Sequence, residues 1–397
     1  MQQKLKNMKN ILIIACLMLL AACEKDSEES VNIEQTVLIY MAADNSLSGY
    51  SNSDINEIII GSHNLTNKQK LLLFIDKSSE NPYLLEVTKG DTIRMKTFNE
   101  ERRSSDALLL QEIMQWTVAR YPCNSYGLVL WGHANGWVYY DQEMIAAPRR
   151  AYGQDSHDNI FTWMNIPDLA EALSTTPRLD FIFADCCAFQ SVESMYELRN
   201  VANYIIGSPA EIPSEGAPYH TLLPTLFSTE SQFYKQVADS YFEQETFDRR
   251  KILLSVVRTD KMEELAQATR QALASFIPQL TDPLHPDVSG LIYYYSHTLF
   301  DMNDFILKYA DNDTYREWKK VFDNAVIYTT YTNRWRANYV NFGDFDISEE
   351  KYGGLNIFIP QLSNKYGSNY ITHLDIQNKG IKHMQWYQAA GLDQLGW

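Results

Sequence analysis

The chain has 397 residues, with 34 Lys or Arg against 50 Asp or Glu, which gives a formal net charge of −16 and a pI near 5.0. This acidic balance argues against nucleic acid as a partner and mildly favours basic peptide segments. About 370 residues remain beyond the N-terminal segment discussed next, enough for one large α/β domain with additions or for two smaller domains.

The N-terminus has the pattern of a lipoprotein export signal. Three lysines within the first nine residues precede an apolar stretch at 11–20, and small residues follow it just before Cys23. The stretch is too short to be a comfortable membrane span. We predict a signal peptide over 1–22, lipidation of Cys23 and a flexible acidic tether over 23–34, which places the protein in a bacterial cell envelope with the lipid as its one membrane attachment. A soluble exported form cleaved nearby is the alternative.

Three cysteines remain outside Cys16 of the signal and Cys23, namely Cys123, Cys186 and Cys187. An odd trio with two adjacent members is not a disulfide framework. Catalysis by one thiol would explain them economically. The competing explanation is packing, since free cysteine is among the most buried residue types, and we expect that role for Cys123 and Cys186.

Alternating elements along the chain predict an α/β fold with a mostly parallel sheet covered by helices on both faces. Strands are expected at 36–40, 70–75, 126–131, 179–184, 204–207 and 251–257, and helices at 53–61, 106–120, 166–173, 192–200 and 263–277. A tyrosine-rich helical section from 291 to about 331 and a strand at 355–359, stopped by Pro360, are expected to follow. We therefore divide the chain into a core over 35–260 and a helical, aromatic-rich C-terminal subdomain over 261–397 that completes the fold.

Two motifs follow buried strands about fifty residues apart. His133 comes just after the strand predicted at 126–131, and Asp185, Cys186 and Cys187 come just after the one at 179–184. In parallel sheets the functional groups gather outside the carboxyl ends of the strands. A thiol near its ordinary pKa of ~8.5 is only a few per cent thiolate at neutral pH, so a neighbouring imidazole is needed to take its proton. This is the layout of a cysteine peptidase.

Together with the segments at 36–45 and 352–358, these motifs make the chain resemble the clostripain family of cysteine peptidases, relatives of caspases, gingipains, legumain and separase. The resemblance spans nearly the whole chain after the signal and implies a caspase-like fold of three layers. It implies His133 as general base or proton carrier and Cys187 as nucleophile, with Cys186 as a packing residue in a place usually held by alanine.

The resemblance also implies an oxyanion site made by the backbone N–H groups of Cys187 and Ala134. The family usually has glycine where this chain has Ala134. If that glycine normally sits at positive φ, the alanine adds strain.

The resemblance further implies cleavage after Arg or Lys, read by an acidic pocket. Asp185 matches the family position, and the stretch 208–216 resembles the specificity loop, with Glu215 as the second acid and Glu211 as an alternative. Both glutamates could instead be solvated loop charges.

The dibasic pair Arg149 and Arg150 invites a self-cleavage hypothesis, with an exposed basic loop as the alternative. Cleavage would turn a zymogen into two associated fragments of one monomer, the first carrying the histidine and the second the nucleophile. No cofactor is required by the sequence.

Asp44, Asn45, Asp155 and Asp158 could hold calcium, which some relatives use, although solvated loop charge is the default for such residues. His157 and His297 lack a companion pattern and are expected to be structural.

Two other functions stay open at this level. One is a catalytically silent, surface-tethered protein that binds basic peptides or glycans, against which the presence of both His133 and Cys187 argues. The other is a transferase that passes the thioester to an amine. The substrates we expect are proteins or peptides with basic residues.

Overall fold

The computed structural model describes residues 32–139, 151–247, 252–295, 299–332, 334–336, 344–362 and 377–397. The predicted signal peptide, Cys23, most of the tether, His297 and the Arg149–Arg150 pair lie outside these ranges. Within them, no helix is long and apolar enough to cross a membrane.

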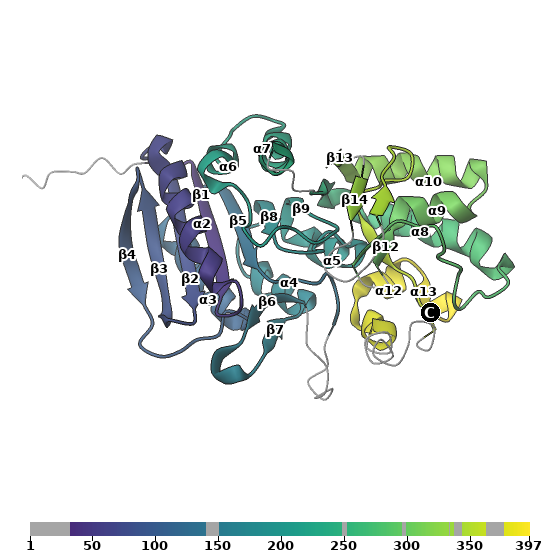
Figure 1. Cartoon of the computed structure of the whole chain (residues 1–397), viewed down its shortest axis with the longest axis horizontal. Helices are drawn as coiled ribbons and strands as arrows, with labels where there is room; N and C mark the ends of the chain where they lie inside the picture. Colours follow the sequence, from purple (N-terminus) through teal and green to yellow (C-terminus); the bar gives the residue numbers. More distant parts are fainter. Residues whose placement is uncertain are drawn as a thin grey trace, which may run out of the picture.

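A nine-stranded sheet forms the centre of the molecule (Figure 1), in the order β13-β10-β9-β8-β5-β1-β2-β3-β4. The five strands from β9 to β2 run parallel, and the two strands at each edge run antiparallel to their neighbours. The sheet strands are β1 (Gln35–Ala43), β2 (Gln69–Lys77), β3 (Glu80–Thr88), β4 (Asp91–Thr97), β5 (Ser125–Gly132), β8 (Leu179–Asp185), β9 (Ala202–Gly207), β10 (Leu254–Arg258) and β13 (Val326–Thr330).

Helices cover both faces of this sheet, which confirms the expected three-layer α/β architecture. All nine residues of β1 are buried, and alternate residues enter two separate apolar cores because successive side chains of a strand point to opposite faces. Three helices contribute to one core, namely α2 (Ser48–Gly61), α6 (Tyr219–Leu226) and α7 (Phe233–Phe247). The other core receives α3 (Ala107–Arg120), α4 (Ile166–Ser174), α5 (Val192–Glu197), α8 (Met262–Phe276), α9 (Met302–Tyr309), α10 (Asn312–Ala325), α12 (Gln385–Ala389) and α13 (Leu392–Leu395).

The C-terminal part gathers at the end of the sheet away from β4 (Figure 1). It completes the sheet, because β13 pairs antiparallel with β10 at the edge. The C-terminal part also forms a separate three-stranded sheet in the order β11-β12-β16. Its strands are β11 (Tyr293–Tyr295), β12 (Leu299–Asp301) and β16 (Asn356–Phe358). The division at residue 260 stays a prediction.

The helical section expected from 291 to about 331 is wrong at both ends, since its last residues form β13 (Val326–Thr330). That stretch begins with the two strands β11 and β12, and helix starts only at Met302. Tyrosine and phenylalanine favour a pleated, half-buried surface. The side chain of Asp301 accepts a hydrogen bond from Asp304 N, so it caps α9 and fixes where the helix begins.

Four further short strands form two separate antiparallel pairs. They are β6 (Tyr152–Asp155) paired with β7 (Thr162–Met164), and β14 (Arg334–Arg336) paired with β15 (Asp344–Asp346). The β6–β7 ribbon matters for function, because it follows the histidine motif and packs against the ends of β1 and β5.

Candidate active site

The register between β5 and β8 places the histidine and the thiol at the carboxyl ends of two neighbouring strands. Trp131 on β5 is the parallel partner of Asp185 on β8. His133 and Cys187 each follow their paired residue by two positions. Since neighbouring strands lie ~4.8 Å apart, the two motifs leave the sheet side by side.

His133 is half-buried and held from two sides. Its ring atom Nε2 lies 2.8 Å from Ser46 Oγ, and its backbone oxygen accepts a hydrogen bond of 2.9 Å from Gly153 N. The ring of Trp163 on β7 lies against the imidazole, with 6.4 Å between ring centroids. The loop after β1 and the β6–β7 ribbon therefore fix the position of the imidazole.

Cys187 is half-buried, and its thiol lies against the loop that follows β9. Its Sγ is 3.5 Å from Ile212 N and 3.9 Å from Ile212 O. Burial raises the pKa of this thiol to about 12, and the carboxylates of Glu211 and Asp185 act in the same direction. In this conformation Cys187 is a neutral thiol at physiological pH.

The start of that loop is tied to the segment that carries the thiol. Ala188 N donates to Ala210 O at 2.7 Å, and Gln190 N donates to Ser208 O at 3.0 Å. Ala188 has φ of 52°, an uncommon value for a residue with a side chain. The turn after the thiol is thus held in its shape by the loop that covers it.

The other two cysteines differ from Cys187 in their surroundings. Cys186 is 1% exposed within the apolar core, and burial raises the pKa of its thiol well above the ordinary value. Cys123 is half-buried, with Sγ 3.1 Å from Ser125 O. All three thiols are reduced. Cys186 has the packing environment that the sequence predicted.

Asp185 is buried below the same loop and points away from the solvent. Its Oδ2 accepts hydrogen bonds from Ala217 N at 3.0 Å and Tyr219 Oη at 2.8 Å, and Oδ1 lies 3.3 Å from Tyr241 Oη. Burial raises its pKa to about 6, although these donors favour the ionised form. Three donors thus orient a carboxyl group beneath the loop.

A second buried acid, Asp54 on α2, was missed by the sequence reasoning. Trp131 Nε1 donates to Asp54 Oδ2 at 2.6 Å. A Cβ placed on Gly216, where φ is 67°, would lie 3.0 Å from Oδ2 of both Asp54 and Asp185. The two carboxyl groups therefore flank one backbone position of the loop.

Asp54 has the more perturbed ionisation of the two acids. Burial raises its pKa to about 8, and the negative charges of Asp185, Glu57 and Glu215 add to the shift. Of the predicted loop acids, Glu215 is exposed and Glu211 is half-buried. Asp54 lies on a helix without a motif, so only its position opposite Trp131 in three dimensions reveals it.

A sequence model of the clostripain family matches residues 39–394. This chain belongs to the clostripain family. It is accordingly a cysteine-type peptidase.

Solved structures of family members agree with this assignment. A secreted C11 cysteine protease from Bacteroides thetaiotaomicron, in complex with an irreversible peptide inhibitor, is 30% identical with a TM-score of 0.76, over 91% of this chain and 99% of that one. An inactive zymogen C11 protease from Parabacteroides distasonis is 30% identical with a TM-score of 0.75, over 90% of this chain and 98% of that one. Curated protein sequences gave no match.

Ala134 does not have the strained backbone that was expected if it replaced a glycine with positive φ. It is not among the described residues with positive φ, whereas its neighbours Gly132 and Gly136 have φ of 147° and 66°. Ala134 instead faces Tyr152 in an antiparallel bridge at the start of β6. The turn around the histidine takes its unusual backbone angles at the two glycines.

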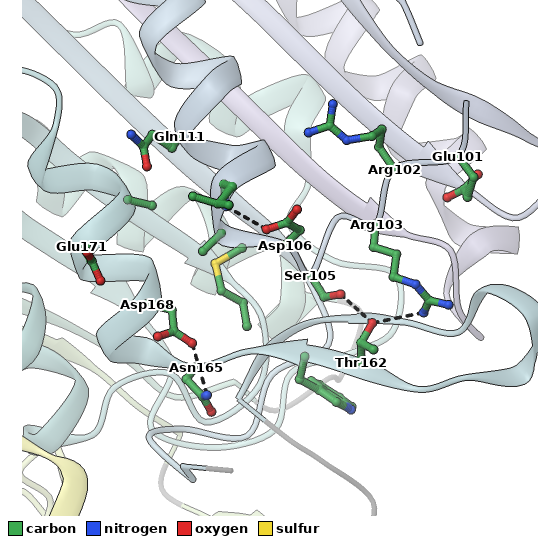
Figure 2. Close-up of a pocket in the computed structure, with 15 residues that line it drawn as sticks. Glu101, Arg102, Arg103, Ser105, Asp106, Gln111, Thr162, Asn165, Asp168 and Glu171 are labelled. Atoms are coloured by element: carbon green, nitrogen blue, oxygen red, sulfur yellow. Dashed lines mark hydrogen bonds between the residues drawn. The ribbon is translucent and has the colours of Figure 1, made fainter. Parts of the chain in front are cut away.

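A cavity of about 740 Å³ lies between α3, α4 and the β6–β7 ribbon (Figure 2). Trp163, whose ring contacts His133, lines it together with Arg103, Thr162 and Asp168. Neither Cys187 nor Asp185 lines this cavity. It is a neighbour of the histidine and separate from the covered thiol.

Proposed function

We propose that this peptidase hydrolyses peptide bonds after Arg or Lys, with Cys187 as nucleophile and His133 as proton carrier. The observation that carries the proposal is the pairing of Trp131 with Asp185, because it brings both groups to one edge of the sheet. Cys186, the alternative nucleophile, is enclosed in the apolar core.

The reaction proceeds through a thioester. The sulfur of Cys187 bonds to the scissile carbonyl carbon while its proton passes to His133. The tetrahedral intermediate collapses, the C–N bond breaks, and the leaving amine takes the proton from the imidazole. Water then hydrolyses the thioester and restores the thiol.

Two backbone N–H groups are the proposed donors to the oxyanion, those of Cys187 and Ala134. Hydrogen bonds from Asn135 N to Ala151 O and from Gly153 N to His133 O bracket the bridge between Ala134 and β6. Residues in such a non-hydrogen-bonded pair point their own N–H groups away from the partner strand. This geometry supports Ala134 as a donor despite the missing glycine.

The resting conformation supports a latent enzyme. A thiol with a pKa of about 12 is a poor nucleophile at neutral pH, and Ile212 N lies 3.5 Å from the half-buried sulfur. The loop at 208–216 must therefore move before Cys187 reacts. The same movement would open the space above Asp54 and Asp185.

The proposed specificity rests on those two acids. A guanidinium or ammonium group beside Asp185 and Asp54 would supply the positive charge that buried carboxylates require. Glu215 and Glu211 lie on the covering loop, where they add negative potential at the entrance.

Maturation by self-cleavage after Arg149 or Arg150 belongs to the same proposal. Both arginines lie outside the described residues, but Ala151, which directly follows them, is buried, and its backbone oxygen accepts a hydrogen bond from Asn135 N. A fragment beginning there would stay associated with the histidine segment. Export to the cell envelope with lipidation at Cys23 is also proposed, in keeping with the secreted relative.

The test uses fluorogenic peptides that end in arginine, lysine or aspartate. Wild type should cleave the two basic substrates, whereas Cys187→Ala and His133→Ala should not. Cys186→Ala is the matched control and should keep activity. Failure of the wild type on every basic substrate would exclude the specificity, and activity in Cys187→Ala would exclude that nucleophile.

Self-cleavage is tested separately by electrophoresis. Wild type should resolve into two fragments that elute together on gel filtration, and Cys187→Ala should stay at full length. A wild type that digests peptides as a single intact chain would exclude maturation at the dibasic pair.

A further inference from the structure

The cavity of about 740 Å³ beside the histidine has no role in the proposed function. It lies between the first turns of α3 and α4 and the β6–β7 ribbon (Figure 2), and its volume is within the range of ~300–1,000 Å³ typical of ligand sites. Trp163 on β7 lines this cavity and also contacts the ring of His133. The cavity therefore adjoins the imidazole directly.

The part of the substrate that faces this cavity follows from the reaction. His133 gives its proton to the leaving amine, so this amine must lie next to the imidazole. The residues that follow the scissile bond are attached to the amine and continue from there. The acidic pocket for the residue before the bond lies elsewhere, because Asp185 is held by Tyr219 on α6 and Tyr241 on α7. Those helices and α3 with α4 cover opposite faces of the sheet.

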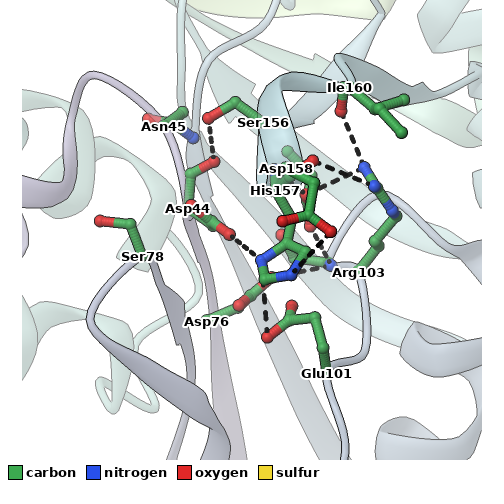
Figure 3. A network of polar contacts seen from close by, with 12 residues as sticks. Asp44, Asn45, Asp76, Ser78, Glu101, Arg103, Ser156, His157, Asp158 and Ile160 are labelled. Carbon is green, nitrogen blue, oxygen red and sulfur yellow. Dashed lines mark hydrogen bonds and ion pairs between the residues drawn. The ribbon is translucent and has the colours of Figure 1, made fainter.

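Trp163 belongs to a ribbon that is held in place by an arginine. The guanidinium group of Arg103 donates to Ile160 O at 2.8 Å and to His157 O at 3.1 Å, and its Nη1 lies 3.4 Å from Asp155 Oδ1. Figure 3 shows Arg103 reaching the backbone oxygen of Ile160 in the turn between β6 and β7. A ribbon fixed in this way needs little ordering when a peptide binds to it.

Apolar side chains that the fold leaves exposed lie in and next to the cavity. Leu108 in the first turn of α3 lines it and is 70% exposed. Ile160 and Phe161, which precede β7, are 57% and 53% exposed. Phe161 comes two residues before Trp163, so the alternation of a strand places both aromatic side chains on one face of the ribbon. Apolar side chains gathered beside a hollow mark a binding surface.

The charged groups of the cavity make it acidic. Its lining holds four acids and two arginines. Both arginines are engaged, since Arg102 Nη1 lies 3.3 Å from Glu112 Oε2, outside the cavity, and Arg103 holds the ribbon. Asp168 and Glu171 on α4 are exposed. The cavity should therefore repel an acidic peptide.

We propose that this cavity binds the substrate residues that follow the scissile bond and selects a large apolar or aromatic side chain, which packs against Trp163 and Leu108. The ring centroids of Trp163 and His133 are 6.4 Å apart, about two residues of extended chain at ~3.3–3.6 Å each. The selected side chain is therefore that of the second residue after the bond. This inference rests on the proposed roles of His133 and Cys187, but not on the preference for Arg or Lys.

A library of synthetic peptides with every position varied is the first test. Mass spectrometry of the products reads the residues on both sides of each cleaved bond. Aromatic and large aliphatic residues should be enriched at the second position after the bond, and aspartate and glutamate should be depleted there. Since the residue before the bond is read separately, the result stays readable if the enzyme does not select Arg or Lys.

Internally quenched peptides then measure the preference. They share one sequence up to the scissile bond, taken from the library, and differ only in the second residue after it, which is phenylalanine, glycine or aspartate. Wild type should cleave the phenylalanine peptide with a kcat/KM about tenfold above that of the glycine peptide, because an apolar side chain leaves water. The aspartate peptide should be cleaved more slowly than the glycine peptide.

Variants locate the binding surface. Trp163→Ala and Leu108→Ala should bring the ratio of kcat/KM between the phenylalanine and glycine peptides close to one, whereas Trp163→Phe keeps a ring and should keep most of the ratio. The ratio is the readout because Trp163 also contacts His133, so that its loss affects absolute rates. Ile93→Ala is the matched control, since it removes a 51% exposed aliphatic side chain from β4, outside the cavity, and should keep the ratio of the parent.

Three results would overturn the proposal. They are the lack of any preference at the second position, a preference that persists in both Trp163→Ala and Leu108→Ala, and an equal loss of preference in Ile93→Ala. A wild type that prefers phenylalanine at this position but cleaves without regard to Arg or Lys would support the proposed cavity and contradict the specificity for basic residues alone.

Discussion

Trp131 and Asp185 are register partners on adjacent parallel strands, and this one relationship organises both halves of the site. Two residues beyond them stand His133 and Cys187. The indole of Trp131 also donates to Asp54, which lies beside Asp185 below Gly216. The pair that aligns the reactive groups therefore also aligns the two buried acids.

Replacing Cys187 and Cys186 one at a time by alanine should distinguish the catalytic thiol from the thiol that only packs in the core. Cys187→Ala should lower kcat/KM on the best basic substrate by about 10⁴-fold or more, because the neighbouring thiol of Cys186 is enclosed in the apolar core and does not reach a substrate. Cys186→Ala should keep activity and lose about 1 kcal/mol of stability, since a buried sulfur is removed from the core. Steady-state kinetics and urea unfolding measure the two effects.

Thiol reactivity should report the covered state of Cys187. A pKa of about 12 leaves roughly 10⁻⁴ of the thiol ionised at pH 8, against about a quarter for an ordinary cysteine. Alkylation of Cys187 by iodoacetamide in uncleaved protein should thus be at least ~10²-fold slower than that of a model thiol, and should accelerate as pH rises. Peptide mass mapping follows it. A fast, pH-independent reaction would show that the loop at 208–216 does not cover the thiol in solution.

The strands that carry the motifs could be predicted because each is a near-continuous apolar run in a sheet buried on both faces. The strand β4 was missed for the opposite reason, whereas β3, six of whose nine residues are buried, was simply overlooked. The sequence of β4 mixes charged and apolar residues, and most of it is exposed at the sheet edge. Its pairing with β3, rather than any pattern of its own, makes it a strand.

The sequence predicted those site residues that directly follow a buried strand. It did not predict those that reach the site only through the packing of distant segments. Cys187 and Asp185 come from one such strand end. Asp54 and Ser46 gave no such signal, because only the packing of α2 and the loop before it against β5 brings them to Trp131 and His133.

Asp185 should govern recognition of basic residues. Asp185→Asn should lower kcat/KM for arginine and lysine substrates by about 10²–10³-fold, because a desolvated cation would lose its charged partner. Glu215→Gln is the matched control, since its exposed carboxylate is screened by solvent and should change kcat/KM only a few-fold. An equal loss in both variants would mean that long-range charge, and not the buried carboxyl group, selects the substrate.

Asp54 should make the fold less stable as pH rises. Its folded pKa of about 8 exceeds the unfolded value of ~3.9, so between these pH values the folded chain holds a proton that the unfolded chain lacks. Its contribution to the free energy of unfolding therefore falls through this window, by up to ~1.4 kcal/mol per pH unit. Asp54→Asn cannot ionise, yet it keeps an oxygen acceptor for Trp131. Urea unfolding at pH 5 and pH 8, in the Cys187→Ala background, should show a smaller pH dependence in the variant.

Ala134→Gly should bring no gain, although glycine is the usual residue after the family histidine. Strain would be relieved only if Ala134 had positive φ, and it does not. Glycine would instead increase the conformational entropy of the unfolded chain and cost about 0.5–1 kcal/mol of stability. The N–H group proposed for the oxyanion is present in both residues, so kcat should stay within about twofold. Urea unfolding and peptide hydrolysis measured side by side check this, and a more stable or much faster variant would mean that the alanine strains the histidine turn after all.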